Sequence, residues 1–571
     1  MNKLLNFKEK SLLVFVVFSM ILGASLEVIS IGVFLPFISQ LLDLNYSENI
    51  AILNKFNSFI SNKFGEVSIL QISIIFASVF VFKNLFIYFG HFINSYFSYK
   101  VTDRVSYKLF NNYLNNDYQN ILSATRSEKI NNIINHIDTF REFINHLLII
   151  ITEILVFCVL LIFLLFISFE EILFSTVVTI IFAYVIYISL KIKTKKWGEV
   201  ISKNREEKID SVVQSFNLFK IIKILNKEGF FNKNFKQHNT QHLKFAHYIY
   251  SVSSLPRHLF EIYGAIFLSL FLVFAFNQNF SNEEILAISS IFLLAILRLL
   301  PATSRIIQSF TRLNFYKYPV EKIYKAYFES QNLEDDRKFL NKKISFKSIE
   351  FKNVFFQYNK NLKPVINDIN IKINKNDFIG IKGKSGSGKT TLVNLLIGLL
   401  KPSKGKLIFN NNQDGDTFNI TPFKIGYVTQ DVFLLNKPII NNIAFGVDNA
   451  NIDLEKINKI LKLCSLEKFI SSIYYSKENL GDGDLQVSGG EKQRLGVARA
   501  LYSDPDIVIF DEFTSSLDDS TEEKLVEGLN KLKEEKCFII ISHKNKPLKY
   551  CKEIYTFEDN QLKKTNQNAQ K

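Results

Sequence analysis

The stretch Gly383-Lys384-Ser385-Gly386-Ser387-Gly388-Lys389-Thr390 decides how the second half of this chain folds and what it binds. It has the glycine spacing of a loop whose backbone N–H groups turn inward around a polyphosphate. Lys389 supplies a positive charge for the β- and γ-phosphates, and the Thr390 hydroxyl is placed to ligate Mg²⁺. A short apolar run, Phe378–Ile381, precedes the loop, and a helical pattern from Thr391 to Leu400 follows it. The pattern predicts a site for ATP and Mg²⁺ between a buried strand and the N-terminus of a helix.

The basic composition of the chain does not indicate a nucleic-acid-binding protein. The net charge is +15 over 571 residues, but the sequence holds no nucleic-acid-binding module and no basic arm. We therefore expect no nucleic-acid partner. The four cysteines lack the spacing of a metal site, which predicts free thiols.

Long apolar stretches dominate residues 1–310. Each is close to or longer than the about 20 residues that a helix needs to cross a bilayer. A helix in a soluble core rarely runs so long, so the sequence predicts a transmembrane domain of six helices. The stretches cover residues 11–41, 69–97, 143–168, 171–190, 254–277 and 284–308.

The distribution of Lys and Arg between the loops predicts the orientation of these helices. Segments 98–142 and 191–250 are rich in basic residues, whereas loop 42–68 holds two. Both termini and the two basic segments are therefore expected on the cytoplasmic side. Apolar positions keep a helical spacing over residues 132–143 and 201–219, which predicts that membrane helices extend into the cytoplasm.

The second part of the chain has a different pattern. A polar connection is followed, from about Phe346, by alternating strands and helices, which is typical of an α/β domain. The predicted fold class is an α-helical six-span transmembrane domain fused to an α/β P-loop nucleotide-binding domain. A tail from Lys563 is expected to be disordered. The predicted limits are 1–320 for the transmembrane domain, 321–344 for a linker, 345–560 for the nucleotide-binding domain and 561–571 for a polar tail.

A second apolar run, Ile507–Phe510, ends in the acidic pair Asp511 and Glu512. We expect Asp511 to hold Mg²⁺ through water and Glu512 to polarise the attacking water as a general base. Such a pair after a strand is a weak signal by itself. It becomes a strong one in a chain that also carries a phosphate loop.

The segment Val487-Ser488-Gly489-Gly490-Glu491-Lys492-Gln493-Arg494 resembles the signature motif of the ATP-binding cassette (ABC) family. That motif usually begins with Leu and has Gln after the two glycines, where this chain has Val487 and Glu491. Ser488, Gly489 and Gly490 match the motif, and the resemblance implies that they contact the γ-phosphate. The negative charge of Glu491 is expected to slow or retune hydrolysis.

Further residues match the ABC family by position. The resemblance implies that Tyr358 stacks on adenine, that Gln430 contacts Mg²⁺, and that His543 contacts the γ-phosphate and acts with Glu512 in catalysis. Ser516 and Asp518 resemble the loop that crosses the dimer interface. The implied metal ligands are Thr390, Gln430 and Asp511. The implied nucleotide-binding residues are Tyr358, Gly383, Lys384, Ser385, Gly386, Ser387, Gly388, Lys389, Thr390, Thr391, Gln430, Ser488, Gly489, Gly490 and Glu491.

The chain carries one phosphate loop and one signature motif. In the ABC family each ATP lies between the phosphate loop of one domain and the signature motif of another. The resemblance therefore implies a dimer, most simply a homodimer with twofold symmetry. Six spans followed by one such domain is the layout of exporters in that family, so we expect ATP-driven export or lipid flipping.

Charged side chains within the predicted spans are costly at bilayer depth and point to a substrate path. Arg257, Arg298 and Arg305 could bind an anionic head group, such as a pyrophosphate. The alternative is that they pair with acidic residues of the spans and only hold the helices together, or lie at the cytoplasmic ends of the helices. The charged residues of the spans are Glu27, Lys83, Glu153, Arg257, Glu261, Arg298 and Arg305.

An amphipathic pattern over residues 52–64 predicts a helix in the first outer loop. Such a helix could lie on the outer leaflet, with membrane lipids as its partner. Packing against the ends of the spans is an equally good interpretation.

Three short parts of the membrane half resemble flippases for lipid-linked oligosaccharides in bacterial protein glycosylation. The resemblance implies a polyprenyl-pyrophosphate glycan that is turned from the inner to the outer leaflet of a bacterial inner membrane. The motifs are short, so an exporter of another lipid, of a peptide or of a hydrophobic drug stays open. The matching parts are Leu26–Gly32 with Leu35-Pro36-Phe37, Leu255-Pro256-Arg257 with Glu261, and Arg298–Ala302 with Arg305.

Overall fold

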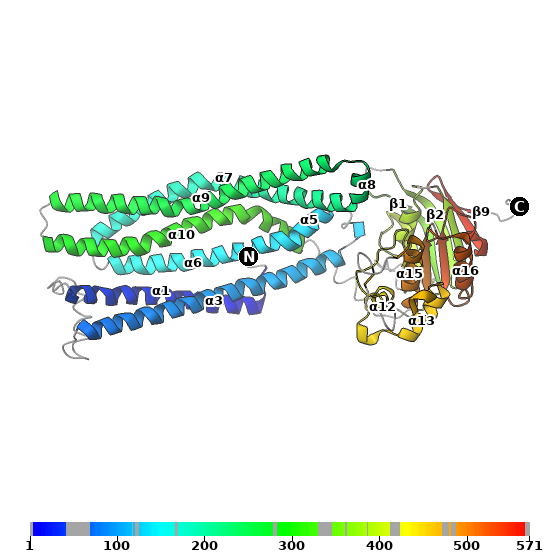
Figure 1. Ribbon diagram of the computed structural model, residues 1–571, viewed down its shortest axis with the longest axis horizontal. Helices are drawn as coiled ribbons and strands as arrows, with labels where there is room; N and C mark the ends of the chain where they lie inside the picture. The colour runs from blue at the N-terminus through cyan, green and yellow to red at the C-terminus, as the bar shows by residue number, and fades with distance from the viewer. Residues whose placement is uncertain are drawn as a thin grey trace. The chain divides into compact units, whose positions relative to one another are not determined.

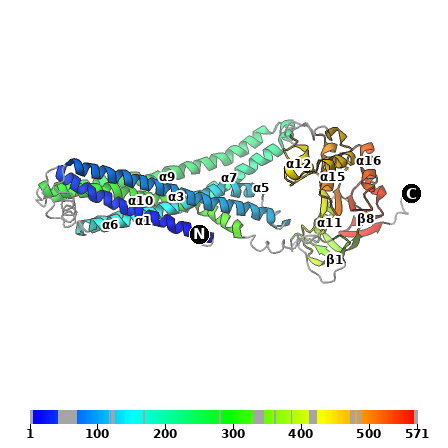
Figure 2. The same cartoon turned by 90° about the horizontal axis from the view of Figure 1, so that it is seen from below.

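The chain forms two compact units, one helical and one of mixed α/β structure (Figure 1 and Figure 2). The first unit comprises residues 1–115 and 124–331, and the second comprises residues 116–123 and 332–571. The computed structural model describes residues 4–41, 69–116, 118–119, 125–165, 169–277, 282–328, 345–359, 363–384, 386–410, 423–470, 479–480, 487–514 and 516–565. The outer-loop helix predicted at 52–64 lies outside these residues.

Long helices make up the described part of the first unit. Helix α10 packs against α6, α7 and α9, while α1 packs against α3 and α6, and α7 lies beside α9 (Figure 1). These helices are α1 (Phe7–Leu41), α3 (Ile69–Asn115), α6 (Ile137–Leu165), α7 (Phe169–Asn217), α9 (Glu228–Asn277) and α10 (Asn282–Phe328).

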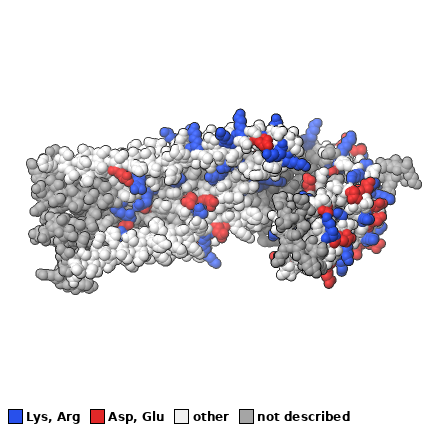
Figure 3. All heavy atoms as spheres, viewed as in Figure 1, with Lys and Arg blue, Asp and Glu red and all other residues white. Residues whose placement is uncertain are grey.

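Four helical segments in the described part of the chain are long and apolar enough to cross a membrane. They are Phe7–Val33, Ser73–Asn115, Arg126–Leu165 and Ile172–Asn217. Figure 3 shows long stretches of the helical unit with few charged atoms, whereas the α/β unit is densely charged. The structure thus supports the first four predicted spans, and the count of six stays a prediction.

The helices continue well beyond the length of a membrane span. Helix α6 is preceded without a break by α5 (Arg126–Asn131) and a π-helical turn at Asn132–His136. Helix α7 is 49 residues long and α9 is 50, against the about 20 residues of one span. The helical structure predicted for residues 132–143 is confirmed, and for 201–219 it is confirmed up to the end of α7 at Asn217, after which the short helix α8 (Phe219–Ile224) begins.

Two sheets build the α/β unit. In the larger one, with the order β5-β6-β7-β3-β8-β9, neighbouring strands are parallel except that β9 runs antiparallel to β8. The smaller sheet is antiparallel, with the order β2-β1-β4. The strands are β1 (Ser348–Phe356), β2 (Ile366–Asn374), β3 (Phe378–Gly383), β4 (Lys404–Phe409), β5 (Ile425–Val428), β6 (Ile507–Asp511), β7 (Cys537–Ile541), β8 (Glu553–Glu558) and β9 (Gln561–Thr565).

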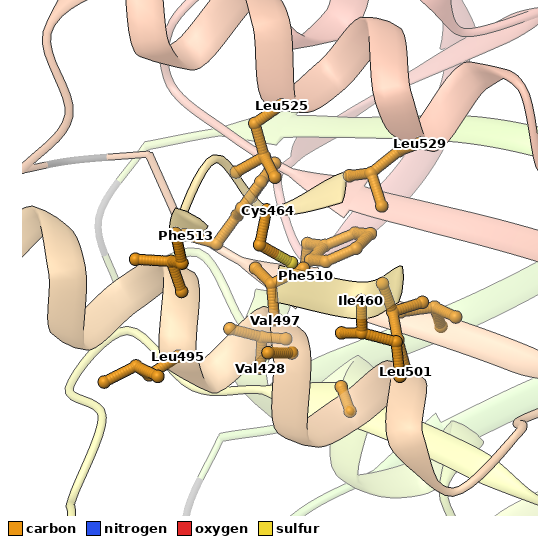
Figure 4. Close-up of a cluster of buried hydrophobic side chains, with 14 of the residues drawn as sticks. Val428, Ile460, Cys464, Leu495, Val497, Leu501, Phe510, Phe513, Leu525 and Leu529 are labelled. Carbon is orange, nitrogen blue, oxygen red and sulfur yellow. The ribbon is translucent and has the colours of Figure 1, made fainter. Parts of the chain in front are cut away.

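The central strands of the larger sheet are buried on both faces, which explains their continuous apolar sequence. In β6, Val508 and Phe510 belong to one hydrophobic cluster, whereas Ile507 and Ile509 belong to a second. The first cluster, drawn in Figure 4, also takes side chains from α13 (Leu454–Leu463), α15 (Gly489–Tyr502) and α16 (Asp519–Asn530). The second cluster joins the two sheets and α11 (Lys389–Leu396).

A short segment between α3 and α5 belongs to the second unit, although it lies within the sequence of the first. Tyr118 packs against the second cluster, and Gln119 donates a hydrogen bond to the carbonyl oxygen of Tyr358 (3.1 Å). The predicted domain limits did not foresee this insertion.

Two local predictions are corrected. The disorder expected from Lys563 is wrong for residues 563–565, because their backbone pairs with β8 in strand β9. The helix after the phosphate loop begins at Lys389 and ends at Leu396 rather than at Leu400. Gly398, with φ of +77°, stops it, since a left-handed glycine is a common end of a helix.

Candidate functional site

The phosphate loop joins the carboxyl end of β3 to α11. Gly386 and Gly388 have φ angles of +77° and +110°, which glycine adopts without strain. Gly383 must be small for a different reason, since a Cβ there would lie 2.9 Å from the Cβ and the carbonyl oxygen of Phe557. Ser385 lies outside the described residues. The sequence thus folds into a sharp turn at the carboxyl-end edge of the sheet.

Lys389 is buried and folds back over this loop. Its Nζ donates hydrogen bonds to the carbonyl oxygens of Gly383 (2.7 Å) and Lys384 (2.9 Å), and lies 3.2 Å from Nε2 of His543. Burial lowers the pKa of Lys389 from its ordinary value, whereas the nearby charges of Glu512 and Asp511 act in the opposite direction. Phosphate oxygens in the loop would compete for the same Nζ donors.

The acidic pair lies where β6 ends. The Asp511 carboxylate accepts a hydrogen bond from the Tyr427 hydroxyl (3.2 Å). Burial raises the pKa of Asp511, the Tyr427 hydrogen bond lowers it, and the charge of Glu512 raises it. Glu512 accepts a hydrogen bond from Nε2 of Gln430 (2.9 Å) and lies 2.9 Å from Nε2 of His543. Its left-handed φ of +51° is uncommon for a residue other than glycine and is typical of functional sites.

The structure therefore brings residues from four strand ends together at one edge of the parallel sheet. The shared position follows from the fold, because the carboxyl ends of parallel strands meet at the same edge. Tyr358 lies beside the first turn of α11, with its hydroxyl 3.1 Å from the Thr391 hydroxyl. The group comprises Lys389, Gln430, Asp511, Glu512 and His543.

Tyr427 was not among the predicted site residues. Its one sequence signal is its place on β5, three residues before Gln430. Because its partner Asp511 lies 84 residues further along the chain, only the folded sheet reveals the contact.

The predicted metal ligands suit Mg²⁺ by their chemistry. Thr390, Gln430 and Asp511 offer hydroxyl, amide and carboxylate oxygens, which are the donors that a hard cation prefers. In the described residues there is no group of three or more His, Cys, Asp or Glu side chains that could hold a metal ion.

Ser488 and Glu491 form a capping box at the start of α15. The Ser488 hydroxyl accepts a hydrogen bond from the N–H of Glu491 (3.3 Å), and the Glu491 carboxylate accepts one from the N–H of Ser488 (2.9 Å). Glu491 also forms an ion pair with Lys468. Burial acts to raise the pKa of Glu491, but the bonds from Lys468 and Ser488 outweigh it and lower the pKa. The negative charge predicted at this position is therefore paired within the chain.

The predicted interface loop lies against the signature segment. A Cβ on Gly490 would lie 3.1 Å from the carbonyl oxygen of Ser516, whose N–H donates to the Gln493 side chain (3.2 Å). Asp518 caps α16 by accepting a hydrogen bond from the N–H of Thr521 (2.9 Å).

The helical unit contains a cavity of about 310 Å³. The Glu27 carboxylate in its wall pairs with Arg298 (2.6 Å) and also with Lys83 (3.4 Å). Arg305 makes two hydrogen bonds to Glu153, of 2.6 and 3.0 Å. Three basic side chains thus share two carboxylates, and both arginines line the cavity together with their acidic partners.

Arg257 differs from the other two predicted substrate-path residues. It pairs with Glu261 one helical turn away (2.9 Å), both side chains are exposed, and neither lines the cavity. The structure therefore groups Arg298 with Arg305 and separates Arg257 from them. The pairing with acidic residues considered from the sequence occurs at all three arginines.

Comparison with known proteins agrees with this geometry. Residues 366–515 match the family model described as ABC transporter. An export ATP-binding/permease protein of Rickettsia typhi is 40% identical over 202 residues, which are 34% of this chain and 34% of that protein. An ATP-dependent lipid A-core flippase of Ralstonia nicotianae is 25% identical over 347 residues, 60% of this chain and 58% of that protein. The matched region thus covers about a third of the length of the Rickettsia protein and somewhat more than half of the length of the Ralstonia protein.

The fold of the whole chain also has a solved counterpart. The structure of a bacterial Atm1-family ABC exporter with ATP bound superposes with a TM-score of 0.75, at 17% sequence identity, over 97% of this chain and 94% of that one. At this identity the likeness shows the fold alone. The α/β unit therefore carries an ABC transporter ATPase domain, and the chain has the fold of an ABC exporter.

Proposed function

We propose that the chain is one half of a homodimeric, ATP-driven exporter in a bacterial inner membrane. Its proposed substrate is a lipid-linked oligosaccharide, a polyprenyl-pyrophosphate glycan, which it turns from the inner to the outer leaflet. The observation that carries the ATP-driven part is the convergence of Lys389, Glu512 and His543 at the phosphate loop. The lipid A-core flippase relative supports lipid flipping as the class of transport.

The ATPase chemistry follows from the positions of these side chains. Glu512, fixed between Gln430 and His543, is placed to take a proton from the attacking water as a general base. Lys389 and His543 supply hydrogen-bond donors for the γ-phosphate. These donors stabilise the charge that spreads over its oxygens as the bond between the β- and γ-phosphates breaks. Thr390, Gln430 and Asp511 would hold Mg²⁺, which neutralises phosphate charge when bound.

The single copy of each motif supports a dimer. Since the chain holds one phosphate loop and one signature motif, and each ATP in the ABC family lies between the two motifs of different domains, a second copy would complete each site. Lys389→Ala spoils only the phosphate loop, and Ser488→Ala spoils only the signature motif. Chains carrying either change alone should be inactive, whereas mixed dimers regain one intact composite site. Full hydrolysis by a single chain in a nanodisc would overturn the dimer.

The cavity supports an anionic head group. Arg298 and Arg305 line it with their two carboxylates, and Lys83, which is not a lining residue, adds a third positive charge through its pairing with Glu27. Guanidinium groups bind phosphate oxygens through paired hydrogen bonds. Exporters of another lipid, a peptide or a hydrophobic drug remain the alternatives, and of these a hydrophobic drug has the least use for the surplus charge.

The substrate is tested by flipping assays in proteoliposomes. Arg298→Ala should cripple flipping of a polyprenyl-pyrophosphate glycan and change basal ATPase far less, because the nucleotide site is untouched. Arg257→Ala is the matched control, since it removes a paired arginine outside the cavity, and it should keep flipping intact. Normal flipping by well-folded Arg298→Ala would remove Arg298 from the substrate path, and a parallel fall of flipping, ATPase and yield would make it structural.

A further inference from the structure

The cavity in the helical unit has polar groups that the arginine pairs do not use. Helix α3 contributes Asn84, His91 and Asn94 to its lining. These residues are seven and three positions apart, so they lie on one face of the helix. This part of α3 is long and apolar enough to span a membrane, where polar side chains are costly unless they serve a cavity or a partner.

Two buried atoms of the lining make no hydrogen bond to any described residue. They are Oδ1 of Asn94 and Nε of Arg298. Buried polar atoms without partners are rare in folded proteins, and they mark places where a ligand or ordered water completes the set. Oδ1 of Asn94 can only accept a hydrogen bond, whereas Nε of Arg298 can only donate one. A ligand that satisfies both therefore offers an acceptor oxygen to Arg298, as a phosphate does, and a hydroxyl or amide N–H donor to Asn94.

The lining also leaves room for such a ligand. Gly23 and Gly90 both line the cavity, and a Cβ added to either would meet nothing within 4 Å. Larger side chains at these positions would project into open space and narrow the cavity. The glycines thus keep free volume beside the polar face of α3.

We infer that Asn84, His91 and Asn94 form a sugar subsite, which hydrogen-bonds hydroxyl and amide groups of the first sugar of a phosphate-linked glycan. This inference rests on the proposed function, in which Arg298 and Arg305 take the phosphate. It assigns different roles to the two groups of residues. The arginines would bind any lipid pyrophosphate, and the α3 residues would distinguish a lipid pyrophosphate that carries a glycan from one that does not.

The test measures binding of two lipids to the full chain in nanodiscs. One is a polyprenyl pyrophosphate that carries a glycan, and the other is the same lipid pyrophosphate without sugar. Wild type should bind the glycan-bearing lipid more tightly. Asn94→Leu should weaken its binding about fivefold to tenfold, the effect of one lost hydrogen bond, and leave the bare lipid within about twofold. Arg298→Gln should weaken both.

Each other outcome decides against a specific part of this picture. The sugar subsite is overturned if wild type binds the two lipids equally. It is also overturned if Asn94→Leu leaves binding of the glycan-bearing lipid unchanged or weakens binding of both lipids equally, and in these cases the phosphate site stands. Binding of neither lipid by wild type overturns the proposed substrate and the subsite with it. Gly90→Leu is a second variant, to be used if Asn94→Leu fails to fold. It should weaken binding of the glycan-bearing lipid more than binding of the bare lipid.

Discussion

Replacing Tyr427 by Phe tests how a buried carboxylate is kept ionised for Mg²⁺. The Tyr427 hydroxyl donates a hydrogen bond of 3.2 Å to Oδ2 of Asp511, which is only 8% exposed. Burial raises the pKa of Asp511, and this hydrogen bond acts against the rise. Phe keeps the ring in its place on β5 and removes only the donor.

The size of the effect follows from the geometry. A hydrogen bond to a charged acceptor stabilises by about 1.5–3 kcal/mol, and at 3.2 Å we take the lower end, about 1.5 kcal/mol. The ionised carboxylate loses this stabilisation relative to its protonated form, so protons compete about tenfold more strongly with Mg²⁺ for Asp511. Since the ionised form of Asp511 loses a partner, its pKa rises further. The acid limb of the ATPase profile should therefore move to higher pH.

The assay is a Mg²⁺ titration of ATPase activity at saturating ATP and several pH values. Half-saturation in the acid limb should need up to about ten times more Mg²⁺, with a smaller change at higher pH. Excess Mg²⁺ should reverse much of the pH shift, because it competes with the proton. Tyr555→Phe makes the same chemical change on β8, where the hydroxyl bonds to Glu553, and should leave both properties unchanged. An unaltered Mg²⁺ dependence and acid limb in folded Tyr427→Phe would refute the reasoning.

Further predictions concern the same unit. Glu512→Gln should keep ATP binding and lower turnover by about 10²–10⁴-fold, and phosphate release near the wild-type rate would contradict the general-base role. Asp511→Asn should raise the melting temperature of the nucleotide-free chain at neutral pH and abolish the further rise with Mg-ATP. Burial raises the pKa of Asp511 in the folded state, so stability that is present below its unfolded-state pKa is lost as the pH rises through its folded-state pKa. Asn has no charge to bury, so this loss does not occur in the variant. An unchanged or lower melting temperature would argue against it. Lys468→Gln should slow ATP hydrolysis by leaving the Glu491 carboxylate without its cation, and adding Glu491→Gln should restore the rate. Equal rates in wild type and Lys468→Gln would show that the pair has no role in turnover.

The frame of the nucleotide site was predictable because its signals are local. The apolar runs Phe378–Ile381 and Ile507–Phe510 became β3 and β6, since strands covered on both faces need apolar residues throughout. The early end of α11 was also available in the sequence. Gly398 lies within the predicted helix, and a glycine two residues before its predicted end favours an earlier helix end.

The contacts that tune the site were not predictable. Tyr427 with Asp511, and Lys468 with Glu491, join residues that are distant or unrelated in sequence pattern, so their pairing appears only once the sheets and helices are packed. Glu491 illustrates what a sequence motif leaves undetermined. The motif shows an acidic residue where a neutral one is usual, but the cation that offsets it lies outside the motif.

The placement of residues 116–123 has a consequence for exchanging parts between exporters. Tyr118 and Gln119 belong to the packing of the α/β unit, although the rest of that unit begins only after residue 331. A chimaera joined at one junction near residue 332 would set a foreign sheet surface against the native Tyr118. The transplantable module is therefore discontinuous. Substitutions at Tyr118 and Gln119 are constrained by a surface that is encoded far downstream, so these residues and that surface have to change together as such proteins diverge.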